Sequence, residues 1–161
     1  MKSIDEQIAA IETQWPEFVL KERTGRTARW EGTLVPVRRP HLVRIRYGVP
    51  SVIERFTINQ IQPRVQVIKP TLQRHPNYEQ GPTPHVYRNP DDTALPYLCL
   101  FNPTGDEWEP GDLIAETILF WAARWLFFYE GWLATKRWRG GGGHLVPAID
   151  AAAGGKRIET V

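Results

Sequence analysis

The sequence contains one cysteine, Cys99, among 161 residues. A single thiol cannot form a disulfide within the chain, so a secreted fold stabilised by internal disulfides is excluded. A secretory signal is not indicated either, because Asp5 and Glu6 lie where a positively charged start and an apolar run would be needed. We therefore expect a cytoplasmic protein.

The sequence also has little net charge and no uninterrupted basic run. Its 20 Lys and Arg residues nearly balance 18 Asp and Glu residues, which gives a formal net charge of +2. Nucleic acid is therefore not indicated as a partner. The most apolar stretch, residues 116–138, is interrupted by Arg124 and Glu130, so we expect a core helix there and no membrane span.

Patterns typical of metal and phosphate sites are missing as well. The single cysteine and the four histidines show no spacing typical of zinc ligands, so we expect no metal and no other cofactor. The glycines at 140–143 are not followed by the lysine and the Ser or Thr of a phosphate-binding loop. A flexible hinge that places His144 is the favoured interpretation.

The first half of the chain shows one helical pattern and then several strand patterns. Ile4, Ile8 and Ile11 recur at helical spacing behind Ser3, which predicts a helix over 3–14. Short turns separate the strand patterns that follow, which favours an antiparallel meander. The expected strands lie near 17–23, 29–37, 42–47 and 64–69, with a weaker piece at 56–58.

A long loop and a long helix are expected in the second half. Residues 69–96 are rich in proline and lack a sustained period, which is typical of a functional loop. Asp112 is expected to cap the helix, with a possible break near Gly131. The order predicts an α+β domain over 1–146 and a tail over 147–161. The aromatic residues assigned to packing against the sheet are Trp121, Trp125 and Trp132.

Cys99 lies where the proline-rich loop ends. Two interpretations compete for it: a small buried hydrophobe between Leu98 and Leu100, or a nucleophile on a rigid support. Asn102 and Gly105 follow closely, so we expect the backbone to leave any strand at once. That course would present the sulfur at the surface.

Several short motifs surround this cysteine. They are PHVY at 84–87, LCL at 98–100, Trp108, WLFFYEGW at 125–132 and WRGGGGH at 138–144. Taken together, they resemble the active-site segment of ubiquitin-conjugating enzymes. The closer resemblance is to bacterial members of that fold encoded beside genes of cyclic-oligonucleotide-based antiphage signalling (CBASS).

The resemblance implies both a fold and an activity. The fold would be the ubiquitin-conjugating one: an N-terminal helix, a four-stranded antiparallel meander, an active-site loop with the cysteine and a long C-terminal helix. Cys99 would accept the C-terminal glycine of a protein as a thioester and pass it to a lysine. The implied donor and partner is a nucleotidyltransferase that makes cyclic oligonucleotides (a CD-NTase, cGAS-like). The oligomeric state stays open.

The resemblance also implies a histidine near Cys99. His85 is the favoured candidate, although it lies 14 residues before Cys99, whereas the family spacing is about ten, and Val86 and Tyr87 replace the family's proline and asparagine. A literal His-Pro-Asn triplet occurs at 75–77, farther from Cys99. Either histidine could instead only structure the loop.

Further candidates would stabilise the oxyanion or handle protons. The asparagines are Asn77 and Asn102, with Asn89 in reserve, and ordinary loop hydrogen bonding is their alternative. Asp91 and Asp92 precede Cys99, and Asp106 and Glu107 follow it; carboxylates there could orient a lysine, or be solvated turn residues. His144 is a last candidate. An inactive binding module and a cysteine hydrolase with His85 as base remain alternative functions.

Overall fold

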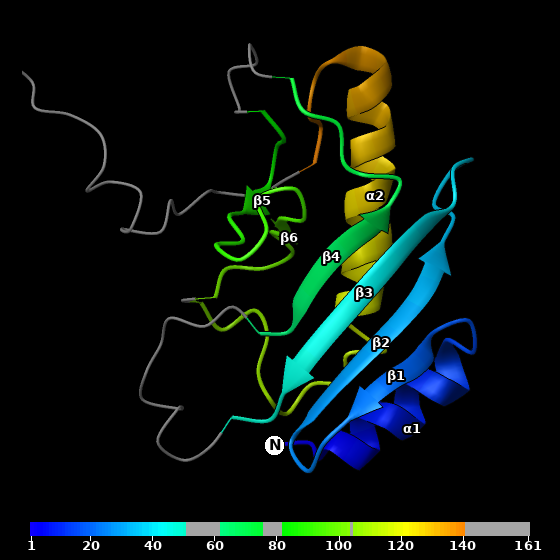
Figure 1. The fold of residues 1–161 in the computed structure, drawn as a ribbon, viewed down its shortest axis with the longest axis vertical. Coiled ribbons are helices and arrows are strands. Elements are labelled where there is room, and N and C mark those ends of the chain that lie inside the picture. The colour runs from blue at the N-terminus through cyan, green and yellow to red at the C-terminus, as the bar shows by residue number, and fades with distance from the viewer. Residues whose placement is uncertain (51–61, 76–81, 104, 141–161) are drawn as a thin grey trace, which may run out of the picture.

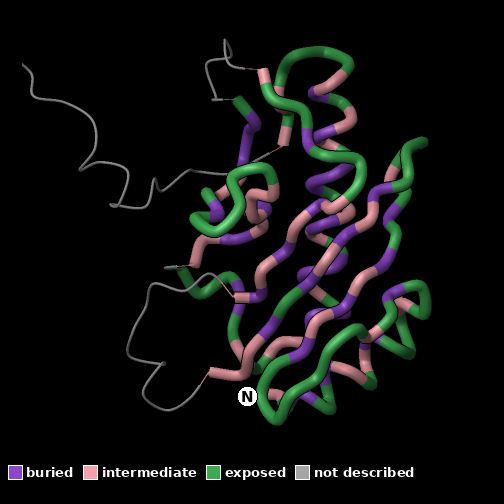
Figure 2. Tube along the Cα trace, viewed as in Figure 1, coloured by how far each residue is buried: buried purple, intermediate pink, exposed green. Residues whose placement is uncertain are grey.

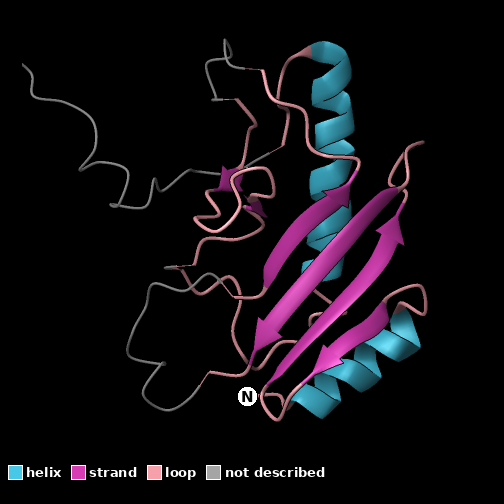
Figure 3. Ribbon diagram, viewed as in Figure 1, coloured by secondary structure: helices cyan, strands magenta, loops and turns pink. Residues whose placement is uncertain are grey.

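The computed structural model describes residues 1–50, 62–75, 82–103 and 105–140 (Figure 1). The expected strand piece at 56–58, the candidates Asn77 and His144, and the expected tail at 147–161 lie outside these residues. The described part is an α+β arrangement with one four-stranded sheet. Helix α2 (Ile118–Thr135) lies behind this sheet, and α1 (Ile4–Gln14) lies beside its edge strand β1 (Val19–Arg23) (Figure 3).

Helix α1 (Ile4–Gln14) confirms the predicted first helix. Ser3 caps it through a capping box, in which the side chains of Ser3 and Glu6 each accept a hydrogen bond from the backbone N–H of the other. Gln7 is buried and joins the helix to the segment before α2. Its amide donates to the Asp112 carbonyl at 2.8 Å and accepts from the Ile114 N–H at 2.9 Å.

The sheet confirms the predicted antiparallel meander. Its strands are β1 (Val19–Arg23), β2 (Thr27–Leu34), β3 (His41–Gly48) and β4 (Arg64–Lys69), and they lie in that order. Figure 2 shows buried positions alternating with less buried ones along the strands. The prediction that the second strand reaches residue 37 was wrong, because β2 ends at Leu34.

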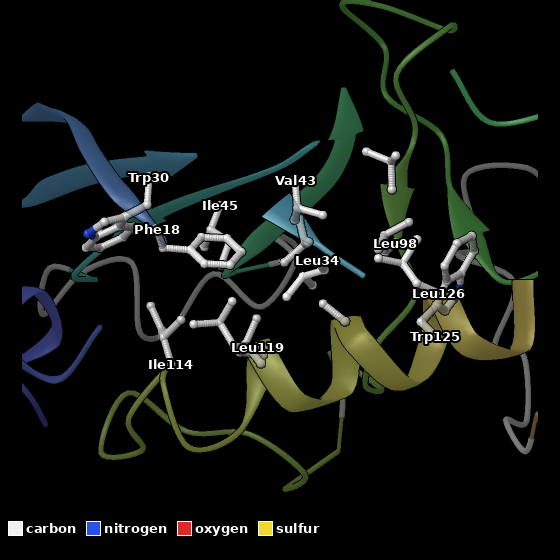
Figure 4. Packing of buried hydrophobic residues seen from close by; sticks show 14 of the residues in the cluster. Phe18, Trp30, Leu34, Val43, Ile45, Leu98, Ile114, Leu119, Trp125 and Leu126 are labelled. Carbon is white, nitrogen blue, oxygen red and sulfur yellow. The ribbon is translucent and has the colours of Figure 1, made fainter. Parts of the chain in front are cut away.

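The core fills the space between the sheet and α2 (Ile118–Thr135). Figure 4 shows side chains of the sheet pointing toward α2. Trp30, Val43 and Ile45 from the strands are 0% exposed. Gly32 of β2 also faces this core, where a Cβ would lie 2.5 Å from Cγ of Phe18. The Phe18 ring therefore occupies the space that a side chain at position 32 would need.

The start of α2 differs from the prediction. Asp112 does not cap a helix; its Oδ2 accepts the Glu109 N–H at 2.8 Å and closes a turn. The helix begins six residues later at Ile118, and Thr117 at its N-cap makes no side-chain capping bond. Of the two courses left open near Gly131, the structure shows the unbroken one, since the helix continues to Thr135. Trp132 in this last turn is 1% exposed and packs on Tyr129, and its burial stabilises the turn despite the glycine.

One partly buried hydrogen bond joins β3 to α2. His41 is 1% exposed, and its Nε2 lies 3.2 Å from Oε1 of Glu130. Burial, the largest cause, lowers the pKa of His41, and the neighbouring Glu130 carboxylate opposes this shift. The buried histidine is therefore harder to protonate than a histidine in the unfolded chain.

The expected loop at 69–96 contains the first strand of a hairpin that the prediction missed, and the second strand follows the loop directly. Strand β5 (Val86–Tyr87) pairs antiparallel with β6 (Tyr97–Leu98) in a small separate hairpin. Two residues per strand are too few to show a period in the sequence. Leu98 is buried, and in Figure 4 it lies above Trp125 and Leu126 of α2, so the hairpin packs on the helix.

No helix in the described ranges is both long enough and apolar enough to cross a membrane.

Candidate active site

Cys99 directly follows β6, at the point where the hairpin pairing ends. Its backbone N–H donates to the His85 carbonyl at 3.0 Å, so its position is tied to the start of β5. The residue is half-buried, whereas the neighbouring Leu98 is only 3% exposed. The prediction that the chain leaves the strand at the cysteine is confirmed. The backbone of Cys99 is therefore fixed at this point, and the residue is still partly open to solvent.

Three neighbouring effects act on the Cys99 thiol. Burial is the largest and raises the pKa of the thiol above its ordinary value. A hydrogen bond with the Tyr87 hydroxyl lowers this pKa, and the Glu107 carboxylate raises it. Because the net shift is upward, most of the sulfur is protonated at neutral pH. A reaction at this sulfur therefore gains from any group that stabilises the thiolate.

His85 lies beside Cys99 through its backbone. Its carbonyl accepts two hydrogen bonds, from the Cys99 N–H and from Nε1 of Trp125 at 2.9 Å. Its φ of 53° lies in the left-handed region, which few residues other than glycine adopt. The two hydrogen bonds on its carbonyl help to hold this conformation. The structure therefore brings together the two main predicted residues, His85 and Cys99.

The imidazole of His85 belongs to an aromatic stack. The side chain is 6% exposed, and its ring stacks on Trp138 with a centroid distance of 4.8 Å and an interplanar angle of 23°. Trp138 also packs on Trp125 at 5.4 Å. The chain reaches this position because Lys136 ends α2 in the left-handed conformation and turns the backbone. Sequence analysis noted Trp138 only as part of a motif and missed its contact with His85.

The tryptophans of α2 have more than one role. Trp125 and Trp132 are buried as predicted, and Trp125 additionally supports the hairpin through its indole N–H. Trp121 is only half-buried and packs on Phe101, with ring centroids 6.2 Å apart. Helix α2 therefore supports the chain on both sides of Cys99.

Tyr87 is the residue near Cys99 that sequence analysis did not select. Its hydroxyl donates to the Phe101 carbonyl, two residues after Cys99, at 3.1 Å. The same hydroxyl lowers the pKa of the Cys99 thiol, which places it close to the sulfur. Burial is the main cause that raises the pKa of Tyr87, so the hydroxyl keeps its proton. The only sequence signal was its place in the PHVY motif, two residues after His85.

The loop between β5 and β6 carries three of the candidate polar residues. Asn89 is 4% exposed; its amide donates to the Leu95 carbonyl and accepts from the Tyr97 hydroxyl. Asp91 and Asp92 are exposed, and Oδ1 of Asp92 accepts the N–H of a nearby loop residue. Asn89 therefore stabilises the loop, while the two carboxylates lie at its surface.

The remaining candidates lie after Cys99 or at the end of α2. The Asn102 N–H donates to Glu107 Oε2 at 2.6 Å, so this carboxylate closes the turn that follows the cysteine. Asp106 is exposed in the same turn. His75 packs on Trp132, with ring centroids 5.1 Å apart, near the C-terminal end of α2.

Metal binding finds no support in the described ranges. No group of three or more His, Cys, Asp or Glu side chains there is placed to hold a metal ion.

Comparison with known proteins adds one finding. A family model described as type II CBASS E2 protein matches residues 7–145, which include all but the first three residues of α1, the sheet, Cys99 and α2. A search of curated proteins found no match.

Proposed function

The chain belongs to the type II CBASS E2 protein family, and from that premise we propose that it is an acyltransferase with Cys99 as its nucleophile. Membership gives it an E2-like role in CBASS, an antiviral defence system, with a protein partner from that system. The proposed acyl donor is a CD-NTase nucleotidyltransferase, joined through its C-terminal glycine. The proposed acceptor is a lysine amine.

The proposed reaction has two steps. In the first, the Cys99 thiolate attacks the carbonyl carbon of an activated C-terminal glycine, such as a thioester; a carbon–sulfur bond forms and the leaving thiolate departs. In the second, a neutral lysine amine attacks the same carbon, and an amide bond forms as the Cys99 thiolate leaves. The proton lost by the amine goes to a nearby base or to the departing sulfur.

The observation that carries the proposal is the placement of Cys99. The only thiol of the sequence lies at the end of a hairpin that is fixed to α2, with its side chain half-buried. A nucleophile on a rigid support meets the carbonyl carbon in a defined direction, which lowers the entropy cost of the reaction. A cysteine that served only packing would gain nothing from partial exposure.

Supporting roles are proposed for the polar residues around it. We assign His85 two roles: its backbone carbonyl positions Cys99, and its ring handles protons. Asp91 and Asp92 are exposed and would orient the incoming lysine. Asn102, in the turn after Cys99, is the proposed oxyanion donor within the described residues.

Non-reducing gels test the proposal. The purified protein is incubated with a partner whose C-terminal glycine carries a small-molecule thioester. We expect an adduct that added thiol removes, because a thioester exchanges with free thiols. Cys99→Ser should give an oxyester adduct that resists thiol, and Cys99→Ala should give no adduct.

Two other results would contradict the proposal. No adduct with the unaltered protein would favour an inactive binding module. Cleavage of a ready-made lysine conjugate by the protein alone, lost in Cys99→Ala, would favour the cysteine hydrolase.

A further inference from the structure

Strand register places Tyr87 and Cys99 on the same face of the hairpin. Val86 pairs with Leu98, and Tyr87 pairs with Tyr97, two residues before the cysteine. Cys99 directly follows β6, and its N–H extends the hairpin pairing by one residue because it donates to the His85 carbonyl. Residues two apart in such a pairing share a face, so Tyr87 and Cys99 are diagonal neighbours. Diagonal neighbours are within reach of an aromatic side chain. The contact between hydroxyl and thiol is therefore a product of the hairpin itself.

The Tyr87 hydroxyl has one proton and two acceptors beside it. One is the Phe101 carbonyl oxygen at 3.1 Å, and the other is the sulfur of Cys99, which the hairpin register places diagonally opposite Tyr87. A neutral thiol is a weak acceptor, so the proton is donated to the carbonyl while the sulfur is protonated or acylated. A thiolate is charged, and hydrogen bonds to charged acceptors are roughly twice as strong as neutral ones. When the sulfur ionises, the Tyr87 hydroxyl therefore donates to the sulfur instead of to the Phe101 carbonyl.

We propose that Tyr87 is a catalytic residue that donates its hydroxyl hydrogen bond to the Cys99 sulfur whenever that sulfur carries negative charge. This inference rests on the proposed function and names a residue that acts in both of its steps. The thiolate is the nucleophile in the first step and the leaving group in the second. The hydroxyl stabilises the charge in each case and returns to the Phe101 carbonyl when the sulfur is neutral.

The surroundings of the sulfur explain why such a donor is needed. Burial and the Glu107 carboxylate both disfavour the thiolate, and the Tyr87 hydroxyl opposes them. Tyr87 stays protonated throughout, since burial raises its own pKa and keeps it a donor. No proton leaves the tyrosine in either step.

The test compares two tyrosine variants on facing strands of the hairpin. Tyr87→Phe removes the hydroxyl at the sulfur, and Tyr97→Phe removes one that donates to Oδ1 of Asn89 at 3.1 Å. The alkylation rate of Cys99 by iodoacetamide is measured from neutral to alkaline pH, and the single cysteine makes the signal specific. The alkylation rate rises with pH as the thiol ionises, and the midpoint of this rise is the quantity compared. We expect Tyr87→Phe to move this midpoint up by about one pH unit and to slow alkylation at neutral pH about tenfold. Tyr97→Phe should leave the midpoint unchanged.

A second variant separates chemistry from folding. A ring-fluorinated tyrosine at position 87 keeps the hydroxyl and makes it a stronger donor, so the midpoint should move down relative to the unaltered protein. This result is expected even if Tyr87→Phe fails to fold. A structural role alone would not move the midpoint in opposite directions in the two variants.

The outcomes distinguish this inference from the proposed function. If the unaltered protein forms the thioester but Tyr87→Phe and the fluorinated variant leave the midpoint unchanged, the role of Tyr87 is overturned and the acyltransferase stands. If the unaltered protein forms no thioester, both are overturned.

Discussion

The hydrogen bond from Trp125 to the hairpin predicts a stability difference between two similar substitutions. Trp125 is 5% exposed and its indole N–H donates to the His85 carbonyl at 2.9 Å. Trp30 is 0% exposed, yet its indole N–H is buried and finds no hydrogen-bond partner within the described part of the chain. Trp125→Phe and Trp30→Phe therefore remove the same atoms from two buried sites that differ in hydrogen bonding.

The magnitude follows from these contacts. Each change removes part of a buried ring, at a cost of about 1 to 2 kcal/mol in lost packing. Trp125→Phe also loses a hydrogen bond, about 1 kcal/mol, although the His85 carbonyl keeps its bond from the Cys99 N–H. Trp30→Phe removes an unpaired donor, which restores about 1 to 3 kcal/mol. We expect Trp125→Phe to be the less stable variant by about 2 kcal/mol or more.

Urea unfolding and thermal melting measure this difference. For a chain of this size, about 2 kcal/mol corresponds to a difference in Tm of roughly 4 to 8 °C. Iodoacetamide labelling of Cys99 adds a local readout. Trp125 donates to the same His85 carbonyl that holds the Cys99 N–H, whereas Trp30 does not, so only Trp125→Phe should change the labelling rate. If Trp30→Phe destabilises the protein as much as Trp125→Phe, the reasoning from the hydrogen bonds is refuted.

Two further predictions concern the core. Gly32→Ala should lower the free energy of unfolding by about 1 to 3 kcal/mol in urea titrations, because its Cβ would overlap the buried ring of Phe18. Stability should also fall as the pH drops below about 6.5, because unfolded histidine then binds a proton that buried His41, with its lowered pKa, does not. Urea unfolding at several pH values measures this fall in stability, which should be smaller in His41→Gln. If the fall is the same in His41→Gln, buried His41 is not its cause.

Elements with a strong local signal could be predicted from the sequence. Strand β4 has the predicted bounds of 64–69, because alternating valines mark its buried face. The start of α1 followed from Ser3, whose side chain caps it. Asp112 misled the prediction, since aspartate closes turns as readily as it caps helices, and only its bond with the Glu109 N–H decides between the two.

The candidate site was predictable only in part. Cys99 and His85 were selected by resemblance, and the structure brings them together through a backbone hydrogen bond. Tyr87 and Trp138 were missed as site residues because their contacts depend on the pairing of a two-residue strand and on the turn after α2. Neither feature leaves a periodic signal in the sequence.

The carbonyl oxygen of His85 binds donors from two segments that are far apart in the chain, Cys99 and Trp125. Rotation of the peptide plane that contains this carbonyl would break both hydrogen bonds at once. The hairpin therefore cannot lose its bond to α2 by such a rotation without also losing its bond to Cys99. A carbon-13 label in this one carbonyl would lower its infrared frequency and set its band apart from the rest. That band would be a vibrational reporter of whether the helix still holds the hairpin while an acyl group is on the sulfur.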